Sequence, residues 1–572
     1  MNSTLRYLQT AHTLSLDTET TGLEQQDLPF AVIIADDLNE YYFDERILGD
    51  MWNLLQCLTP KVWVFQNAKF DLKMCARMGF TPSSLHYYDI ACGSRLMRND
   101  PLQHSLDAQA KRYLGKDKSD LVKKYIKDHN LYEVRKDFFG VEYKSPRYDR
   151  VPVELMAEYA CLDARLTYDL HQLYSRQLDP ASLELYDMES QLIPVCLDME
   201  ETGLLLDKQY TLEAMYAEQD TLISLVYKYK SITGAEYVNS AKSIQKVLSI
   251  ELPKTEGGNP SLTDDVIDWL LVEGSPRDKE IGDIVRSIRS LDKRITTYFK
   301  SYLNFATKQN IIHPTMWQAG TRTGRFSYSD PNLQNIPKEE TPEYAHIVRK
   351  CFIPRAGKKY VSFDYSQMEY RMCVAYANET EIIEQVMNGV DFHQATADLV
   401  GITRKHAKTL NFAVLYGAGV DKIAAMLGCT VTQAEVLKYK YFSKLPKVER
   451  LIDSIIATGK SRGYVMTWTK RRMYADKEFC YALPNHLIQS GGADVVKKAM
   501  IQIATEVPEI PMVLQVHDQL VFEMYPEEFG RIEKIKQIME SVFPPMNGMT
   551  LKVDVSIGTS LAETDMVKYE SN

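Results

Sequence analysis

The chain has 572 residues and a mass of 65.7 kDa, which at about 100 to 200 residues per domain predicts about three to five domains and excludes a single small binding module. Hydrophobic residues make up 45% and charged residues 25% of the chain, close to an average globular protein, so wholesale disorder is excluded. The formal charge of −10 argues against a surface that coats nucleic acid everywhere, although it leaves room for a local basic cleft.

The sequence carries no signal for secretion or membrane insertion. No stretch approaches about 18 uninterrupted apolar residues, and the first residues lack a charged-then-apolar pattern. None of the nine cysteines forms a CxxC pair, which excludes a zinc ribbon and a disulfide framework. We therefore expect a cytoplasmic protein with reduced thiols and no membrane partner.

Strands open the chain. Residues 13–17 (TLSLD) and 32–35 (VIIA) are typical of strands, and a third apolar run spans 61–71. Helical periodicity then dominates to about residue 174 and includes a candidate helix over 153–170. These elements predict an α/β first domain that ends near residue 175.

Two further segments are distinctive, one inside this first domain and one after it. Residues 111–150 hold twelve Lys or Arg against seven Asp or Glu, interleaved with tyrosines. Such a segment indicates either a loop region that contacts a nucleic acid strand or a solvated charged face, and the sequence favours neither. Residues 181–310 are helical in pattern with one break at 252–261.

Acidic residues follow the first strands at suggestive spacings. Asp17 and Glu19 lie two residues apart, so period-two geometry points both carboxylates to one face of a strand. Asp71 ends the third apolar run, while Tyr159 and Asp163 lie one helical turn apart. Two ions such as Mg²⁺ or Mn²⁺, held by hard carboxylate oxygens, can activate a water for phosphodiester hydrolysis. Any one of these acids alone is more often a solvated turn residue, so the hypothesis rests on the ordered set.

With HSLDAQAKRYLG at 104–115, this ordered set resembles the DEDDy class of 3′-to-5′ exonucleases. The resemblance implies that Tyr159 orients the attacking water. It also implies four metal ligands: Asp17, Glu19, Asp71 and Asp163.

A second pair of acids lies in the C-terminal half. The apolar strand YVSF delivers Asp364 at its end, and residues 512–524 indicate a strand, a tight turn and a strand that place Asp518 at a hairpin tip. Each aspartate alone is more often an ordinary turn or strand-end acid. Together they can hold two Mg²⁺ ions against a triphosphate, which is the geometry of phosphoryl transfer.

Between these acids, two cations and an aromatic residue recur at four-residue intervals. Arg404, Lys408 and Phe412 share one helix face, and Gly417 is a plausible terminator of that helix. Cations suit a triphosphate and an aromatic ring suits a sugar or base. On spacing alone, a structural role for this stripe remains the more frequent explanation.

Four strings now identify a family: TGRFSYSDPNLQNIP, FDYSQMEYR, RKHAKTLNFAVLYG and QVHDQLVFE resemble the family A DNA polymerases in their known order. The similarity implies a multidomain mixed α and β (α/β) fold, with an RNase H-like exonuclease domain followed by a right-hand polymerase and without a 5′-nuclease domain. It implies these segments: exonuclease 1–175, thumb 176–300, N-terminal palm 301–371, fingers 372–480 and C-terminal palm 481–572.

The resemblance also implies roles for single residues at the nucleotide site. Asp364 and Asp518 hold the catalytic metals, with the main-chain carbonyl of Tyr365 as a further ligand, and Glu369 crowds the ribose 2′ carbon as a steric gate. The other residues implied to bind the incoming nucleotide are Gln367, His393, Arg404, Lys408, Phe412 and Tyr416. Those implied to contact the primer-template are Arg325, Asn335, Asn485, Gln489 and His517.

The implied cofactors are two Mg²⁺ ions per active site, with Mn²⁺ able to substitute. The implied partners are primer-template DNA and deoxynucleoside triphosphates, and we expect a monomer. Helicase, primase and single-strand binding proteins are not identifiable from the sequence. The missing 5′-nuclease favours a bacteriophage source, which would place the protein in the host cytoplasm.

One position departs from the family pattern, because Gln519 stands where glutamate usually follows the hairpin aspartate. We expect activity to persist with an altered metal dependence. Two alternatives stay open: a nuclease whose polymerase half has decayed, and a silent primer-template binding protein. A single-subunit RNA polymerase shares the palm, but the exonuclease set and Glu369 favour DNA synthesis.

Overall fold

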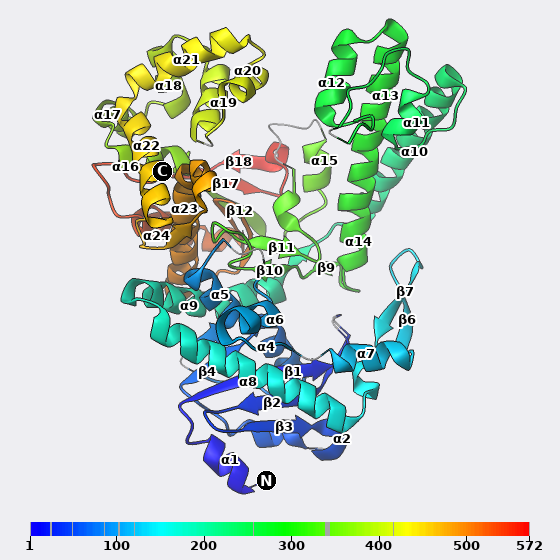
Figure 1. The fold of residues 1–572 in the computed structure, drawn as a ribbon, viewed down its shortest axis with the longest axis vertical. Coiled ribbons are helices and arrows are strands. Elements are labelled where there is room, and N and C mark those ends of the chain that lie inside the picture. The colour runs from blue at the N-terminus through cyan, green and yellow to red at the C-terminus, as the bar shows by residue number, and fades with distance from the viewer. Residues whose placement is uncertain are drawn as a thin grey trace.

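The computed structural model describes residues 2–22, 24, 26–48, 50–84, 86–100, 103–118, 120–255, 257–337, 344–415 and 417–570. Two separate five-stranded sheets organise the chain, one near each end of the sequence, and helices surround both (Figure 1). Tyr416, implied to bind the nucleotide, lies outside the described residues. Across the described ranges, no helix combines the length and the apolar character that a membrane crossing requires.

The N-terminal sheet has the strand order β3-β2-β1-β4-β5. Its strands are β1 (Thr13–Thr20), β2 (Pro29–Ala35), β3 (Glu40–Asp44), β4 (Val62–Phe65) and β5 (His86–Asp89). β1 is central, antiparallel to β2 and parallel to β4. The strands expected over 13–17, 32–35 and in the third apolar run are therefore confirmed.

Alternate residues of β1 face opposite layers. Leu14 and Leu16 lie in one buried cluster with Leu72 of helix α4 (Ala68–Arg77). On the other face, the Ser15 hydroxyl donates to the carbonyl of Ala164 at 2.8 Å, in helix α8 (Val153–Gln177). Figure 1 shows α8 crossing the sheet, and this period-two alternation sends Asp17 and Glu19 toward α8 as well.

The helical structure expected to dominate after the third strand is interrupted in two places. β5 completes the sheet, and a hairpin forms from β6 (Tyr132–Lys136) and β7 (Glu142–Pro146). The hairpin lacks the usual alternation of buried apolar and exposed polar residues. Its apolar Val134 points outward with 59% exposure, whereas Arg135 turns inward. The basic segment 111–150 thus contains helix α7 (Leu121–Asp128) and this hairpin.

The C-terminal sheet has the order β15-β16-β12-β17-β18. Its strands are β12 (Lys359–Tyr365), β15 (Met512–Val516), β16 (Gln519–Met524), β17 (Val553–Gly558) and β18 (Met566–Lys568). The expected strand before Asp364 and the expected hairpin over 512–524 are both confirmed. Phe363 and Phe522 pack edge to face in the buried core with ring centroids 5.4 Å apart.

Two helical lobes stand apart on either side of this sheet (Figure 1). One contains α10 (Lys208–Thr233), α11 (Ala241–Gln245), α12 (Asp264–Glu273), α13 (Pro276–Lys293) and α14 (Ser301–Phe305). The other contains α17 (Thr380–Met387), α18 (Phe392–Val400), α19 (Arg404–Leu415), α20 (Val420–Leu427), α21 (Val431–Lys444) and α22 (Pro446–Arg462). The described residues 252–255 and 257–261 include no helix, so the predicted break is confirmed for them.

Helix α9 (Pro180–Thr202) joins the N-terminal unit to the rest through buried charges. Glu189, 1% exposed, accepts from Arg471 at 2.9 Å and from the Lys497 ammonium at 2.5 Å. Arg471 also pairs with Asp494 at 2.7 Å, and Lys497 and Asp494 both lie on helix α23 (Leu483–Glu506). Removing one member of such a network leaves a buried charge without its partner, so α9 is fixed to the C-terminal part.

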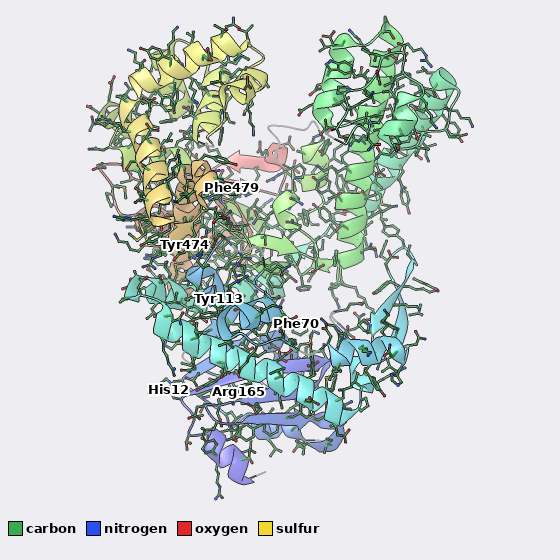
Figure 2. The ribbon with its side chains drawn as sticks, viewed as in Figure 1. His12, Phe70, Tyr113, Arg165, Tyr474 and Phe479 are labelled. Atoms are coloured by element: carbon green, nitrogen blue, oxygen red, sulfur yellow. The ribbon has the colours of Figure 1, made fainter. Side chains whose placement is uncertain are left out.

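A second contact between the units involves helix α5 (Ile90–Met97) and the residues after it. The Arg98 guanidinium lies 4.6 Å from the ring centroid of Tyr474, a residue labelled in Figure 2. Asn99 accepts from the Tyr474 amide at 2.8 Å. Polar contacts from α9 and from the residues that follow α5 thus join the N-terminal unit to the C-terminal part of the chain.

Candidate active sites

Four acids from three elements lie near one another around the C-terminal half of β1. Asp17 and Glu19 come from β1, Asp71 from α4 and Asp163 from α8. The Thr18 amide and hydroxyl both donate to Asp71 Oδ1, at 3.0 and 2.7 Å, and so hold α4 against the strand. These four residues are called the N-terminal acid cluster below.

The members of this cluster raise one another's pKa values. Burial, followed by repulsion from Asp163, raises the pKa of Asp17 to about 7. Burial, followed by repulsion from Asp17, raises the pKa values of Glu19 and Asp71 well above their ordinary range. The folded chain therefore carries an electrostatic repulsion that a bound cation would relieve.

The donors of the cluster fit a hard divalent cation in kind. All four are carboxylates, and Asp163 Oδ1 is buried without a hydrogen-bond partner among the described residues. Among the described residues, no group of three His, Cys, Asp or Glu side chains is arranged closely enough to hold a metal ion. Instead the Lys118 ammonium forms an ion pair with Asp163 Oδ2. Binding a cation would therefore require these side chains to close around it.

The raised pKa of Asp17 predicts a pH-dependent stability. A carboxyl group whose pKa rises to about 7 on folding keeps its proton in the folded state, so stability falls as the pH rises from about 4 to 7. In EDTA at pH 8, the variant Asp17→Asn should melt about 1 to 2 °C above the wild-type protein, the order expected for 1 to 2 kcal/mol in a chain of 572 residues. The advantage should shrink toward pH 4 in thermal unfolding scans. An equal gain at every pH, or the same gain in the exposed control Asp37→Asn, would refute the assignment.

The second acid pair lies at one end of the C-terminal sheet. Asp364 is directly opposite Gln519 on β16 and Asp554 on β17. Asp518 precedes Gln519 at the hairpin tip, and its carbonyl accepts from the Tyr365 amide at 3.3 Å. Asp364 and Asp518 therefore lie at the same end of the sheet, one position apart across the β12–β16 pair. They are called the C-terminal acid pair below, and as carboxylates they fit the same kind of cation.

Gln519 has a structural partner at this end of the sheet. Its amide donates to the Ser362 hydroxyl at 2.6 Å, two residues before Asp364. Asp554, which the sequence did not single out, places another carboxylate on the same face, but Lys568 pairs with it at 3.3 Å. The altered metal dependence expected from Gln519 stays a prediction.

Arg404, Lys408 and Phe412 lie on α19, as their spacing indicated. Asp391, which caps the start of α18, accepts from the Arg404 guanidinium by two bonds of 3.0 Å and from Gln367 at 2.8 Å. Burial would raise the pKa of Asp391, but the hydrogen bonds from Arg404 and its neighbours lower it to about 2. Asp391 therefore stays charged and holds both residues, a role that sequence reasoning missed.

His393 is buried between α18 and α19 with 4% exposure. Its Nδ1 lies 3.0 Å from the Asn411 amide, and its ring centroid is 6.2 Å from that of Phe412. Tyr370 packs edge to face on both rings, at 5.0 and 5.2 Å. The rings of His393 and Tyr370 thus both pack against the ring of Phe412.

The residues implied to contact the primer-template lie at four places along the chain. Arg325 forms an ion pair with Glu369, in the first turn of helix α16 (Met368–Ala377). Asn485 and Gln489 lie one turn apart on α23. The structure thus brings the implied steric gate and an implied DNA contact into direct interaction.

The remaining two implied contacts lie at the hairpin tip and in the segment bonded to it. Asn335 is exposed at the end of a short helical turn, Leu333–Asn335. His517 occupies the tip with a φ of 54°, in the left-handed region. Gln334 joins the two segments, because it donates to the Gln515 carbonyl at 3.2 Å and accepts from the His517 amide at 3.3 Å.

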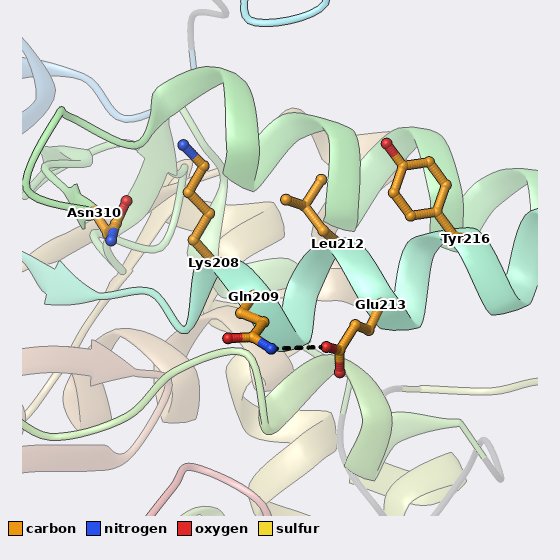
Figure 3. Close-up of a pocket in the computed structure, with 6 residues that line it drawn as sticks. All are labelled: Lys208, Gln209, Leu212, Glu213, Tyr216 and Asn310. Atoms are coloured by element: carbon orange, nitrogen blue, oxygen red, sulfur yellow. Dashed lines mark hydrogen bonds between the residues drawn. The ribbon is translucent and has the colours of Figure 1, made fainter.

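A pocket of about 440 Å³ lies elsewhere, at the start of α10. Figure 3 shows its lining, which shares no residue with either group of acids: Lys208, Gln209, Leu212, Glu213, Tyr216 and Asn310. Gln209 donates to Glu213 at 3.0 Å across one helical turn.

Comparisons with known proteins agree with this division. A family model described as DNA polymerase family A matches residues 209–563, and one described as 3′-5′ exonuclease matches residues 1–179. DNA polymerase I of Pseudomonas aeruginosa is 28% identical over 98% of this chain and 64% of its own length. The DNA polymerase of Mycobacterium phage L5 is 26% identical over 91% of this chain and 88% of its own length. The chain thus spans somewhat less than two thirds of the first bacterial relative.

A solved structure supports the same fold. The polymerase domain of Pol1 from M. smegmatis, in complex with a DNA primer-template and dNTP, superposes with a TM-score of 0.83 at 22% identity and covers 98% of each chain. At this identity the superposition shows the architecture alone.

Proposed function

The chain belongs to DNA polymerase family A and carries a 3′-5′ exonuclease domain at its N-terminal end, and from this membership we propose a DNA polymerase that proofreads. It would extend a primer on a DNA template with deoxynucleoside triphosphates and remove mispaired nucleotides from the 3′ end. The observation that carries the proposal is the presence of two groups of carboxylates on two sheets, one in each matched segment. Each group suits phosphoryl transfer assisted by divalent cations.

The division of the chain is part of the proposal. The first domain, 1–175, would be the exonuclease, and the segment 176–300, which includes α10 to α13, would be the thumb. The palm would combine 301–371 with 481–572, because β12 and β15 to β18 form one sheet. The fingers would be the helical lobe within 372–480.

Family A polymerase and exonuclease domains generally use divalent metal ions. We propose that Asp364 and Asp518, with the Tyr365 carbonyl, hold two Mg²⁺ ions at the polymerase site. Such ions polarise the α-phosphate and stabilise the attacking and leaving oxygens when bound. Mn²⁺ would substitute, since it accepts the same carboxylate oxygens.

The fingers residues would recognise the triphosphate by charge. Lys408 and Arg404 would contact phosphate oxygens, Arg404 after leaving Asp391. Phe412 would pack on the sugar, backed by His393 and Tyr370. The exchange of Arg404 between a carboxylate and a phosphate would couple nucleotide binding to closure of α19.

Glu369 is expected to exclude ribonucleotides, because Arg325 holds its carboxylate in place. The variant Glu369→Ala should raise the ratio of ribonucleotide to deoxynucleotide incorporation efficiency by about 10²-fold, a loss of discrimination worth about 3 kcal/mol. Single-nucleotide insertion kinetics with matched dNTP and rNTP measure this ratio. Glu381→Ala, an exposed glutamate on α17, serves as the control. An unchanged ratio in Glu369→Ala would remove Glu369 from this role.

The N-terminal acid cluster would serve hydrolysis of the primer end. Asp17, Glu19, Asp71 and Asp163 would hold two Mg²⁺ ions, and Tyr159 would orient the attacking water. The raised pKa values of the acids support this use, since a cation would relieve their repulsion. Both sites would therefore use Mg²⁺, one to add nucleotides to the primer and the other to remove them.

A primer with a labelled 5′ end on a longer template tests the whole proposal. With Mg²⁺ and all four dNTPs the primer should lengthen, and without dNTPs it should shorten. Shortening in both lanes would favour a nuclease with a decayed palm. An unchanged primer in both lanes would favour a silent binding protein, and preference for ribonucleotides would favour an RNA polymerase.

A further inference from the structure

Lys118 reaches into the N-terminal acid cluster from a loop that no motif identifies. Its side chain is 15% exposed, whereas those of Lys111 and Lys116, earlier in the same segment, are 74% and 49% exposed. Its ammonium forms an ion pair with Asp163 and lies 4.5 Å from the centroid of the Tyr159 ring. Burying a lysine in this way is costly unless the cation has a specific partner.

The position of Lys118 conflicts with a cation bound at Asp163. The ammonium holds Asp163 Oδ2, one of the oxygens that a divalent ion would need. Both charges are positive, so the ion and the ammonium compete for one carboxylate. When an ion occupies the cluster, Lys118 must turn to another anion within reach of its side chain.

The substrate supplies that anion. A phosphodiester bound for hydrolysis brings its negative oxygens to the same ions and to Tyr159, which Lys118 already contacts. A lysine ammonium binds a phosphate oxygen as a point charge and needs no fixed orientation. The step requires only rotation of the lysine side chain and transfers no proton.

We propose that Lys118 is a phosphate-binding residue of the exonuclease site. It pairs with Asp163 while the cluster is free of cations and moves to an oxygen of the terminal phosphodiester once cations and DNA bind. This inference rests on the proposed exonuclease function and adds a residue to its substrate contacts. It predicts opposite effects on two measurements, which a purely structural lysine would not produce.

The variant Lys118→Met tests this exchange, with Lys116→Met as the matched control. Lys116 is two residues earlier and pairs with Asp169 at 3.1 Å on the exposed side of α8. Mn²⁺ binding without DNA is measured by calorimetry in an Asp364→Asn, Asp518→Asn background, so that the N-terminal cluster is titrated. Hydrolysis of a single-stranded oligonucleotide is followed at saturating Mg²⁺.

Lys118→Met should bind Mn²⁺ about tenfold more tightly, because the competing ammonium is gone, and should hydrolyse DNA about 10²-fold more slowly. Lys118→Arg should recover most of the rate, since a guanidinium also binds phosphate. Lys116→Met should change neither quantity by more than about twofold.

Three results would overturn the proposal. Weaker Mn²⁺ binding together with slower hydrolysis would show that Lys118 only holds Asp163 in place. No change in Mn²⁺ binding would exclude the competition, and an unchanged hydrolysis rate would exclude the phosphate contact. If the unchanged protein hydrolyses no DNA, the proposed exonuclease function fails, whereas the Mn²⁺ titration still decides whether Lys118 competes with a cation.

Discussion

Replacing Asp364 with asparagine is expected to lower primer extension by about 10³-fold or more while leaving removal of 3′ nucleotides within about twofold. Asp364 and Asp518 lie at the same end of the sheet, and loss of one charge from the proposed metal-binding pair would cost transition-state stabilisation of about 4 kcal/mol. Asparagine has the same shape, so the sheet should keep its packing. Rapid-quench extension of a labelled primer measures the effect.

The informative control is Asp554→Asn, directly opposite Asp364 on β17. Lys568 already neutralises Asp554 and its side chain is exposed, so we expect extension to fall by less than about fivefold. If both variants lose activity equally, the acidity of the whole strand end, and not Asp364 itself, supports catalysis. If Asp364→Asn keeps full activity, the polymerase assignment of this site is wrong.

Replacing Asp17 and Glu19 together with alanine is expected to lower exonuclease activity by about 10³-fold or more and to leave primer extension within about twofold. Both side chains lie on β1 near Asp71 and Asp163, so the cluster would lose two of the four carboxyl groups that could bind a cation. Because the two sites lie on separate sheets, the palm should keep its geometry. Loss of labelled nucleotide from a mispaired primer end measures the effect.

The same assay with Asp37→Ala and Glu40→Ala removes two exposed acids from the N-terminal domain without touching the cluster. That control should hydrolyse DNA at nearly the rate of the wild-type protein, since exposed charges contribute little to the stability of the fold. Retained hydrolysis in the Asp17, Glu19 variant would move the nuclease site elsewhere. Parallel loss of primer extension would indicate damage to the fold.

The features that could be predicted from the sequence are those determined by residues close together in the chain. Asp17 and Glu19 obey the period of a strand, and the turn between two apolar runs places Asp518 at a hairpin tip. The stripe of Arg404, Lys408 and Phe412 obeys the period of a helix. Each pattern spans a few residues, so it is visible without knowledge of the rest of the chain.

Contacts between distant segments explain what the sequence could not predict. Lys118 lies 45 residues from Asp163, in a segment whose charges are equally typical of a solvated face. Asp391 looks like an ordinary helix cap until Arg404 and Gln367 are seen to converge on it. The β6–β7 hairpin was missed because Arg135 faces inward to bind Asp27 at 2.7 Å, reversing the usual alternation. Such side chains are assigned by tertiary structure and not by local pattern.

The buried charges of α9 determine where the chain can be cut. The polymerase family match begins at residue 209, yet Glu189 on α9 is the partner of both Arg471 and Lys497. A fragment trimmed to the start of that match would leave Arg471 and Lys497 with only Asp494 to balance their charges, at a cost of several kcal/mol. The smallest independently stable polymerase therefore begins before α9, and this helix belongs as much to the catalytic hand as to the nuclease that precedes it.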